Sequence, residues 1–155
     1  MKKTSLRFLQ THTNMASVID ELAPDLFGEG YKDNGDRIPY SLFVEAVEQV
    51  PIAISITDKK ARILYVNEEF SRVTGYQPAD ILGENESLLS DKRTPRDVYY
   101  DLWHTIRAKK IWRGTLCNRH KSGHRYLSDL TIAPMLNEQG MVTHYIGMHR
   151  DSTQS

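Results

Sequence analysis

The stretch that decides the fold is residues 52–70, which read IAISITDKKARILYVNEEF. Residues 52–57 alternate apolar residues with small or polar ones at a period of two, which is typical of a half-buried β-strand. Residues 58–61 suit a turn, and the apolar run at residues 63–66 returns as a second strand. This stretch therefore predicts a β-hairpin.

Short helices are predicted on both sides of the hairpin. Before it, residues 43–50 carry apolar side chains at helical spacing, and Pro51 ends the segment. After it, Asn67 is a good N-cap for a helix over residues 68–74, which starts with acidic residues and is followed by glycine. A further short helix is predicted over residues 78–82, because it opens with proline and a glycine stops it.

A longer helix is expected after a charged loop at residues 91–93. Thr94 is its predicted cap, Pro95 its first residue, and Asp97 follows three residues after the cap. An apolar stripe predicts that this helix packs on a core, and its members are Val98, Leu102, Trp103 and Ile106.

Three further strands are predicted at residues 112–119, 126–135 and 142–149. The segments between them, residues 121–123 and 137–140, are rich in turn-forming residues. Tight turns make consecutive strands antiparallel. The predicted fold class is therefore α+β, a five-stranded antiparallel sheet with helices covering one face.

The domain organisation follows from this order. Residues 1–36 are predicted to be an N-terminal extension, residues 37–151 the folded domain and residues 152–155 a tail. Within the extension, residues 17–27 have the spacing of a short amphipathic helix, and isolated helices of this length are marginal in water. The extension is therefore either weakly ordered or a contact in a homodimer formed through the N-terminal helices.

Composition narrows the class of protein. The 155 residues include 20 basic and 20 acidic residues, so no net charge draws the chain to nucleic acid or to an anionic membrane. Cys117 is the single cysteine, which favours a reducing compartment, and no apolar run approaches the ~20 residues of a membrane span. We expect a cytoplasmic protein.

The segment 83–90 reads GENESLLS and does not resemble a plain surface loop. It places polar residues directly before two leucines. Loops that combine polar groups with apolar side chains in this way usually fold over something, so this segment is a candidate binding element.

The order of elements, together with several local motifs, resembles a PAS domain from about Tyr40 to Asp151. The segments that carry the resemblance are residues 52–58, 63–70, 74–76, 81–83, 118–123 and 145–151. PAS domains bind haem, flavins, small acids or no ligand, so the fold alone does not fix a function.

Within this superfamily the chain is most similar to flavin-binding members. In the photoreceptor (LOV) branch, a cysteine in the loop that corresponds to residues 83–90 bonds to the flavin, and here Glu86 stands in its place. Light-driven adduct chemistry is therefore not expected. Asn118 and Ser128 match two asparagines that face the flavin ring, and His149 matches a glutamine near N5. The two phosphate-binding arginines of that branch correspond to Ser87 and Trp103.

These departures resemble the NifL-like branch, the FAD-binding redox sensors found in regulators of nitrogen fixation and methane oxidation. The motifs that match are Asn85-Glu86-Ser87, Thr94-Pro95-Arg96, Leu102-Trp103, Trp112-x-Gly114 and residues 148–151. The resemblance implies FAD as the cofactor, with Trp103 packed near it and Asn85 at the ribityl chain. Ser55, a polar residue in an otherwise apolar strand, would contact a flavin carbonyl or N5.

Glu86 is the residue with the sharpest functional expectation. A carboxyl group in a closed pocket beside the ring should have a raised pKa because of desolvation. Glu86 would then couple the redox state of the flavin to the protein. The alternative is an ordinary exposed glutamate at a helix start.

The sequence therefore predicts a sensory module, not an enzyme, that responds to redox state or oxygen and passes the signal to an effector domain or regulatory protein. The alternatives are a cofactor-free dimerisation module, a haem sensor with His104 as ligand, and a small flavoenzyme. No acid, base or nucleophile stands apart from the flavin contacts, which disfavours the enzyme. Cys117, His120 and His124 have a zinc-like spacing, but no fourth ligand is evident and no metal is expected.

Overall fold

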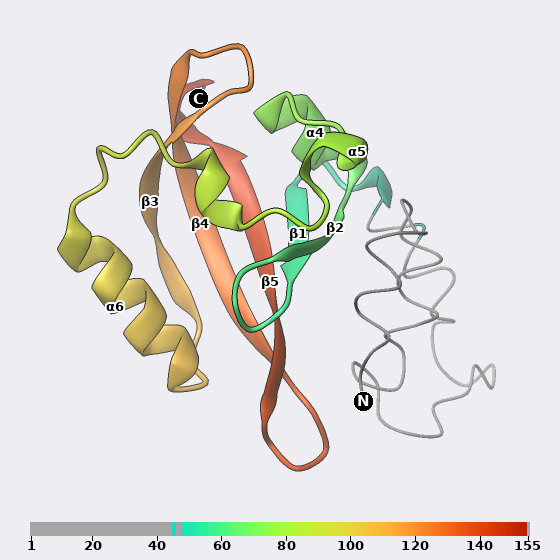
Figure 1. The fold of residues 1–155 in the computed structure, drawn as a ribbon, viewed down its shortest axis with the longest axis vertical. Helices are drawn as coiled ribbons and strands as arrows, with labels where there is room; N and C mark the ends of the chain where they lie inside the picture. Colours follow the sequence, from blue (N-terminus) through green and yellow to red (C-terminus); the bar gives the residue numbers. More distant parts are fainter. Residues whose placement is uncertain (1–44, 46–47, 155) are drawn as a thin grey trace.

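The computed structural model describes residue 45 and residues 48–154 (Figure 1). The N-terminal extension with its predicted helix at residues 17–27 lies outside this part, as does most of the helix predicted before Pro51. The elements in chain order are β1 (Ala53–Thr57), β2 (Ile63–Val66), α4 (Glu68–Thr74), α5 (Pro78–Ile81), the 3-10 helix η1 (Glu86–Leu89), α6 (Arg96–Arg107), β3 (Trp112–Arg119), β4 (Arg125–Leu136), β5 (Val142–Asp151) and the 3-10 helix η2 (Ser152–Gln154).

The five strands form one antiparallel sheet in the order β2-β1-β5-β4-β3, which confirms the predicted α+β class. The last strand in the sequence, β5, lies at the centre and pairs with both β1 and β4. The helices α4, α5 and α6, with η1, gather on one side of the sheet (Figure 1). The cavity described below lies between these helices and the sheet.

Asn67 joins the first hairpin to the first helix. Its Oδ1 accepts hydrogen bonds from the backbone N–H of Ile54 (2.8 Å) and of Phe70 (3.1 Å), and its Nδ2 donates to the carbonyl of Ile52 (3.0 Å). The expected N-cap is thus confirmed, and the same side chain also ties α4 to β1. The helix ends at Gly75, whose φ of 82° lies in the left-handed region that glycine adopts without strain.

Two clusters of buried apolar side chains hold the helices on the sheet. The first, beneath α4, α5 and η1, consists of Ala53, Ile63, Val66, Phe70, Ile81 and Leu89. The second, beneath α6, consists of Leu102, Ile106, Trp112, Leu116, Leu130, Ile132 and Tyr145. Each fully buried side chain of this size stabilises the fold by about 1.5–3 kcal/mol relative to an exposed one.

The start of α6 differs from its prediction. The helix begins at Arg96, Pro95 occupies the cap position, and no side chain caps it. Thr94 does not cap the helix, because its Oγ1 accepts a hydrogen bond from the backbone N–H of Cys117 (2.8 Å). The hydroxyl therefore holds the chain against β3 instead.

The segment before α6 is the predicted charged loop, and it also covers the edge of β3. Ser90 pairs with Asn118, and the N–H of Asp91 donates to the carbonyl of Cys117 (3.2 Å). The Asp91 side chain is fully buried and lies 3.0 Å from the guanidinium of Arg125. The Cys117 thiol also donates to this carboxylate, over 3.3 Å.

Asp91 is expected to make stability depend on pH. Burial alone would raise the pKa of its carboxyl, but the backbone N–H of Arg93, the Cys117 thiol and two arginines together hold the pKa below its usual 3.8. A depressed pKa gives stability that is present above the usual value and lost as the pH falls through the lowered one. Asp91→Asn should therefore lower the urea midpoint most at pH ~7, and the difference from wild type should shrink below pH ~4. A difference that does not change with pH would contradict this assignment.

Candidate cofactor site

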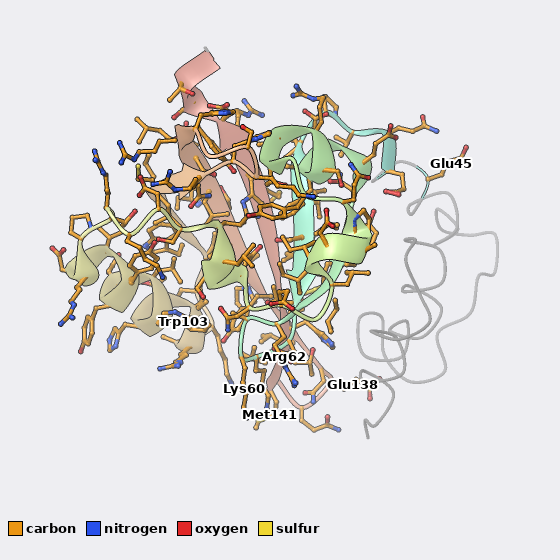
Figure 2. All side chains as sticks on the ribbon, turned by 45° about the horizontal axis from the view of Figure 1, so that its top comes forward. Glu45, Lys60, Arg62, Trp103, Glu138 and Met141 are labelled. Atoms are coloured by element: carbon orange, nitrogen blue, oxygen red, sulfur yellow. The ribbon has the colours of Figure 1, made fainter. Side chains whose placement is uncertain are left out.

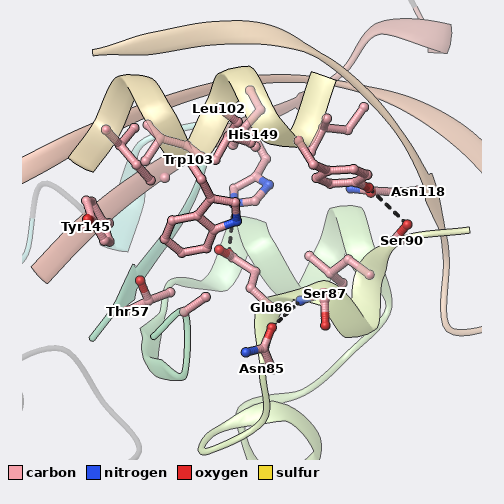
Figure 3. A pocket seen from close by; sticks show the side chains of 18 residues that line it. Thr57, Asn85, Glu86, Ser87, Ser90, Leu102, Trp103, Asn118, Tyr145 and His149 are labelled. Carbon is pink, nitrogen blue, oxygen red and sulfur yellow. Dashed lines mark hydrogen bonds and ion pairs between the residues drawn. The ribbon is translucent and has the colours of Figure 1, made fainter. Parts of the chain in front are cut away.

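A cavity of about 130 Å³ lies between η1, α6 and the helix-facing side of the sheet (Figure 3). The residues that line it are Thr57, Ala61, Asn85, Glu86, Ser87, Leu89, Ser90, Tyr99, Leu102, Trp103, Ile106, Leu116, Asn118, Leu130, Ile132, Tyr145, Gly147 and His149. Most of this surface is apolar, and the polar groups are few and placed at defined points. Ligand sites for small molecules have this composition.

Three strands supply the floor of the cavity through the period-two alternation of their side chains. Leu116 and Asn118 on β3 point to the same side as Leu130 and Ile132 on β4. On β5, Gly147 lies opposite Ile132 and Ser55 in the sheet register. Because glycine has no Cβ, the sheet is hollowed at its centre.

A connected polar cluster lies at one wall of the cavity. Ser55 Oγ donates to Glu86 Oε1 over 2.6 Å, and it lies 3.0 Å from His149 Nε2. A serine hydroxyl has one proton, so the contact with His149 requires an Nε2–H donor on the imidazole. His149 Nε2 is also 3.4 Å from Glu86 Oε1, and the edge of the Phe70 ring packs on the imidazole with centroids 5.4 Å apart. Glu86 and His149 point toward each other beside Trp103 (Figure 3).

The expected raised pKa of Glu86 is wrong. Burial does raise the pKa of the carboxyl, but the hydrogen bond and charge of His149 and the hydroxyl of Ser55 outweigh it, so the net shift is downward. The side chain keeps 21% of its surface exposed. In this arrangement Glu86 Oε1 acts as a hydrogen-bond acceptor for Ser55.

A second polar region lies on β3 and β4. Asn118 is 4% exposed and lines the cavity, so its amide faces inward as predicted. Burial raises the pKa of its neighbour Tyr126 to about 12, although a hydrogen bond from Asn118 lowers it in part. Ser128 is fully buried on the same face of β4, and within the described residues its Oγ has no hydrogen-bond partner.

The buried Ser128 hydroxyl, which has no hydrogen-bond partner among the described residues, bears on whether a cofactor could bind here. A buried polar group without a partner costs free energy, and such groups in native proteins usually have a partner that the protein chain does not supply. Neither Ser128 nor Ser55 is among the residues that line the cavity. Polar groups reach it through Asn118 on β3 and through Glu86 and His149, and Ser55 contacts both members of that pair from behind the lining. A planar heterocycle with polar edges, such as a flavin, suits this distribution.

Two other predicted site residues reach the cavity in different ways. Trp103 lines it and packs against Tyr145 in an edge-to-face contact with centroids 6.0 Å apart. Asn85 also lines it, but its amide already bonds the chain: Oδ1 accepts from the N–H of Ser87 (2.9 Å), and Nδ2 donates to the carbonyl of Lys60 (3.0 Å). Asn85 therefore shapes η1, and contact with a ribityl chain remains a prediction.

Several lining residues were not singled out from the sequence. Tyr145 and Gly147 share the period-two face of β5 with His149, and Thr57 shares that of β1 with Ser55. Extending the alternation from the predicted residues would have found these three. Tyr99 donates to Ser90 Oγ over 3.0 Å, and nothing in its local sequence indicates that contact.

The zinc-like spacing does not form a metal centre. Cys117 bonds Asp91, while His120 and His124 stack with centroids 4.5 Å apart and both place Nδ1 3.0 Å from Ser122 Oγ. Within the described part of the chain, no three metal-ligating side chains converge.

Comparison with known proteins identifies the family. The family model described as PAS domain matches residues 49–154. The chain belongs to the PAS family. The nitrogen fixation regulatory protein of Klebsiella oxytoca is 45% identical over 114 residues, which cover 74% of this chain and 23% of that protein. The aerotaxis receptor of Escherichia coli is 27% identical over 100 residues, covering 64% of this chain and 20% of that protein.

Solved structures agree with the fold. An RNA-binding light-oxygen-voltage receptor superposes with a TM-score of 0.72 at 25% identity, covering 81% of this chain and 37% of that one. This PAS domain thus spans about a quarter or less of the length of the curated relatives named above. In the described residues, no helix is both long and apolar enough to cross a membrane.

Proposed function

We propose that this PAS domain holds FAD non-covalently, responds to redox state or oxygen, and relays that state to an effector domain or regulatory protein. The observation that carries the proposal is the hydrogen-bonded cluster of Ser55, Glu86 and His149 at the wall of an apolar cavity whose far end holds Asn118. The likeness to a nitrogen fixation regulatory protein and to an aerotaxis receptor supports a sensory role.

Each group has a role in binding. The inward amide of Asn118 can both donate and accept, which suits the N–H and carbonyl edge of a flavin pyrimidine ring. Ser128 Oγ would find its missing partner at the same edge. Leu102, Ile106 and Leu130 provide apolar surface for the ring faces and exclude water.

Redox coupling would work through hydrogen-bond exchange. A bound FAD supplies two-electron chemistry and a ring nitrogen that is an acceptor when oxidised and a donor when reduced. Glu86 is an acceptor only, so it can take a hydrogen bond from a donor in the cavity at the expense of the one from Ser55. Ser55 and His149 lie on the paired central strands β1 and β5, so a change in their partners acts on the middle of the sheet.

The lining residues do not favour a photoreceptor. Adduct formation needs a thiol against the ring, and none of the residues that line the cavity in the described structure is a cysteine. Cys117 lies on β3 with its thiol bonded to Asp91. The domain is therefore proposed to respond to electrons and not to light.

The absorbance spectrum tests flavin binding directly. Protein mixed with FAD and then desalted should show flavin bands near ~370 and ~450 nm, because the cofactor carries its own chromophore. A Soret band in protein as purified would indicate haem instead. A spectrum without bands after both treatments would favour the cofactor-free interaction module and overturn the proposal.

Glu86→Gln tests the coupling. The amide has nearly the same shape but can donate as well as accept, so FAD should still bind, while the flavin reduction potential and its dependence on pH should both change. Glu84→Gln, in the exposed part of the same loop, is the matched control and should change neither. Spectroelectrochemical titration across pH 6–9 measures both quantities. Identical potentials and pH slopes in wild type and Glu86→Gln would remove Glu86 from the mechanism.

A further inference from the structure

The C-terminal half of α6 carries an exposed arginine, Arg107, that packs on a residue of the cavity lining. The guanidinium carbon of Arg107 lies 4.9 Å from the ring centroid of Trp103, one helical turn earlier. Trp103 lines the cavity and is half-buried, and it lies at one edge of the domain on the same side as Lys60 and Arg62 (Figure 2). Stacking on the indole face holds the guanidinium in place and leaves its N–H donors available.

The positive charge of Arg107 acts on Tyr145, which lines the cavity. Burial raises the pKa of Tyr145, and the nearby positive charge of Arg107 lowers it in part. Tyr145 and Trp103 both line the cavity, so the guanidinium lies close to two of its lining residues. Within residues 48–154 Arg107 makes no ion pair, whereas Arg62, on the same side, is paired with Asp58.

The proposed cofactor needs a cation at this place. FAD carries a diphosphate beyond its ribityl chain, and no lysine or arginine is among the residues that line the cavity in the described structure. A cation for the diphosphate would therefore come from outside this lining. Guanidinium groups bind phosphate oxygens through paired N–H donors.

We propose that Arg107, held on Trp103, is the phosphate-binding residue of the site, and that it makes the domain select phosphorylated flavins over riboflavin. This inference rests on the proposed function, because it assumes that the cavity takes a flavin ring. It adds a determinant of specificity that lies outside the cavity lining itself.

The test compares three ligands, FAD, FMN and riboflavin, by the quenching of flavin fluorescence on titration with cofactor-free protein. Arg107→Gln should weaken FAD and FMN binding by about three- to tenfold, the range of a partly exposed ion pair with charge-assisted hydrogen bonds. Riboflavin affinity should stay within about twofold, because its ribityl chain carries no charge to interact with Arg107. Arg96→Gln, an exposed arginine at the other end of α6, is the matched control and should change no affinity.

The dependence of FAD affinity on ionic strength is a second measurement. It would not differ between wild type and Arg107→Gln if Arg107 had only a structural role. Raising the ionic strength from about 0.05 to about 0.5 M should weaken FAD binding by wild type more than by Arg107→Gln, because screening acts on the charge that the variant lacks. Arg107→Glu should weaken FAD and FMN further than Arg107→Gln. Far-UV circular dichroism confirms that the variants fold.

The outcomes separate this inference from the proposed function. If all three flavins bind and Arg107→Gln leaves the ratio of FAD to riboflavin affinity unchanged, the assignment of Arg107 is overturned while flavin binding stands. An equal loss for all three ligands would show that Arg107 only supports the packing of Trp103, and would also overturn it. If wild type binds no flavin, the proposed function fails and the inference fails with it.

Discussion

Asn67→Ala is expected to lower the free energy of unfolding by about 2–4 kcal/mol, from the loss of a helix cap and of hydrogen bonds to buried backbone groups. The side chain is 1% exposed and satisfies the N–H groups of Ile54 and Phe70 and the carbonyl of Ile52. Alanine leaves all three without this partner, in places that water reaches poorly. Urea denaturation followed by tryptophan fluorescence measures the change.

Asn67→Asp is the matched comparison for this prediction. It keeps an acceptor for the two N–H groups and places negative charge at the helix N-terminus, but loses the donor to Ile52. Its loss of stability should therefore be smaller than that of Asn67→Ala. Glu68→Ala, one residue on and exposed, should stay within about 0.5 kcal/mol of wild type. A loss below about 0.5 kcal/mol for Asn67→Ala would show that the hairpin and helix are joined in some other way.

Gly147→Val is expected to weaken FAD binding by at least about a hundredfold, because crowding of 1–3 kcal/mol adds to the loss of space for the ring. A Cβ at this position would lie 3.0 Å from Ser55 Oγ, 3.1 Å from His149 Nε2 and 3.7 Å from Leu130 Cδ1. The two remaining methyl groups of valine would enter the cavity. Titration with FAD, with circular dichroism as a check of folding, measures the effect.

A graded series makes this prediction specific. Gly147→Ala adds only the Cβ, so the neighbours need to move by a few tenths of an ångström, and the loss should be about tenfold. Ile146→Val, on the same strand but facing away from the cavity, should bind FAD as wild type does. Unchanged FAD binding in Gly147→Val would mean that the ring does not lie against this strand.

The fold could be predicted because its signals are local. Strand β3 matches its predicted bounds. Asn67 caps the start of α4 and Gly75 caps its end, as predicted from their residue types. The start of α6 was mispredicted because Thr94 has the residue type of a helix cap, but its Oγ1 accepts a hydrogen bond from a backbone N–H of β3 instead. A contact between segments that are distant in the chain overrides a local preference, and sequence alone does not show which one wins.

The sequence predicted which residues lie at the site better than it predicted their ionisation. Of the predicted site residues, Ser55 and Ser128 do not line the cavity, although Ser55 contacts Glu86 and His149. The others do line it: Asn85, Glu86, Trp103, Asn118 and His149. The direction of the Glu86 pKa was mispredicted because desolvation can be argued from a single residue, whereas the opposing effect comes from His149 on a distant strand. Electrostatic balance depends on distances that no motif encodes.

The chain between η1 and α6 has a consequence for how the cavity can open. Ser90 and Asp91 occupy the hydrogen-bonding edge of β3, and Thr94 satisfies a further backbone N–H there. The same few residues connect the two walls that close over the cavity. If η1 and α6 moved apart at this point, the backbone groups at the edge of β3 would lose their partners. An unpaired strand edge can pair with another molecule, which is a known route to aggregation. Protection against self-association and retention of a bound molecule therefore depend on one short segment, and a variant that loosens it should lose both together.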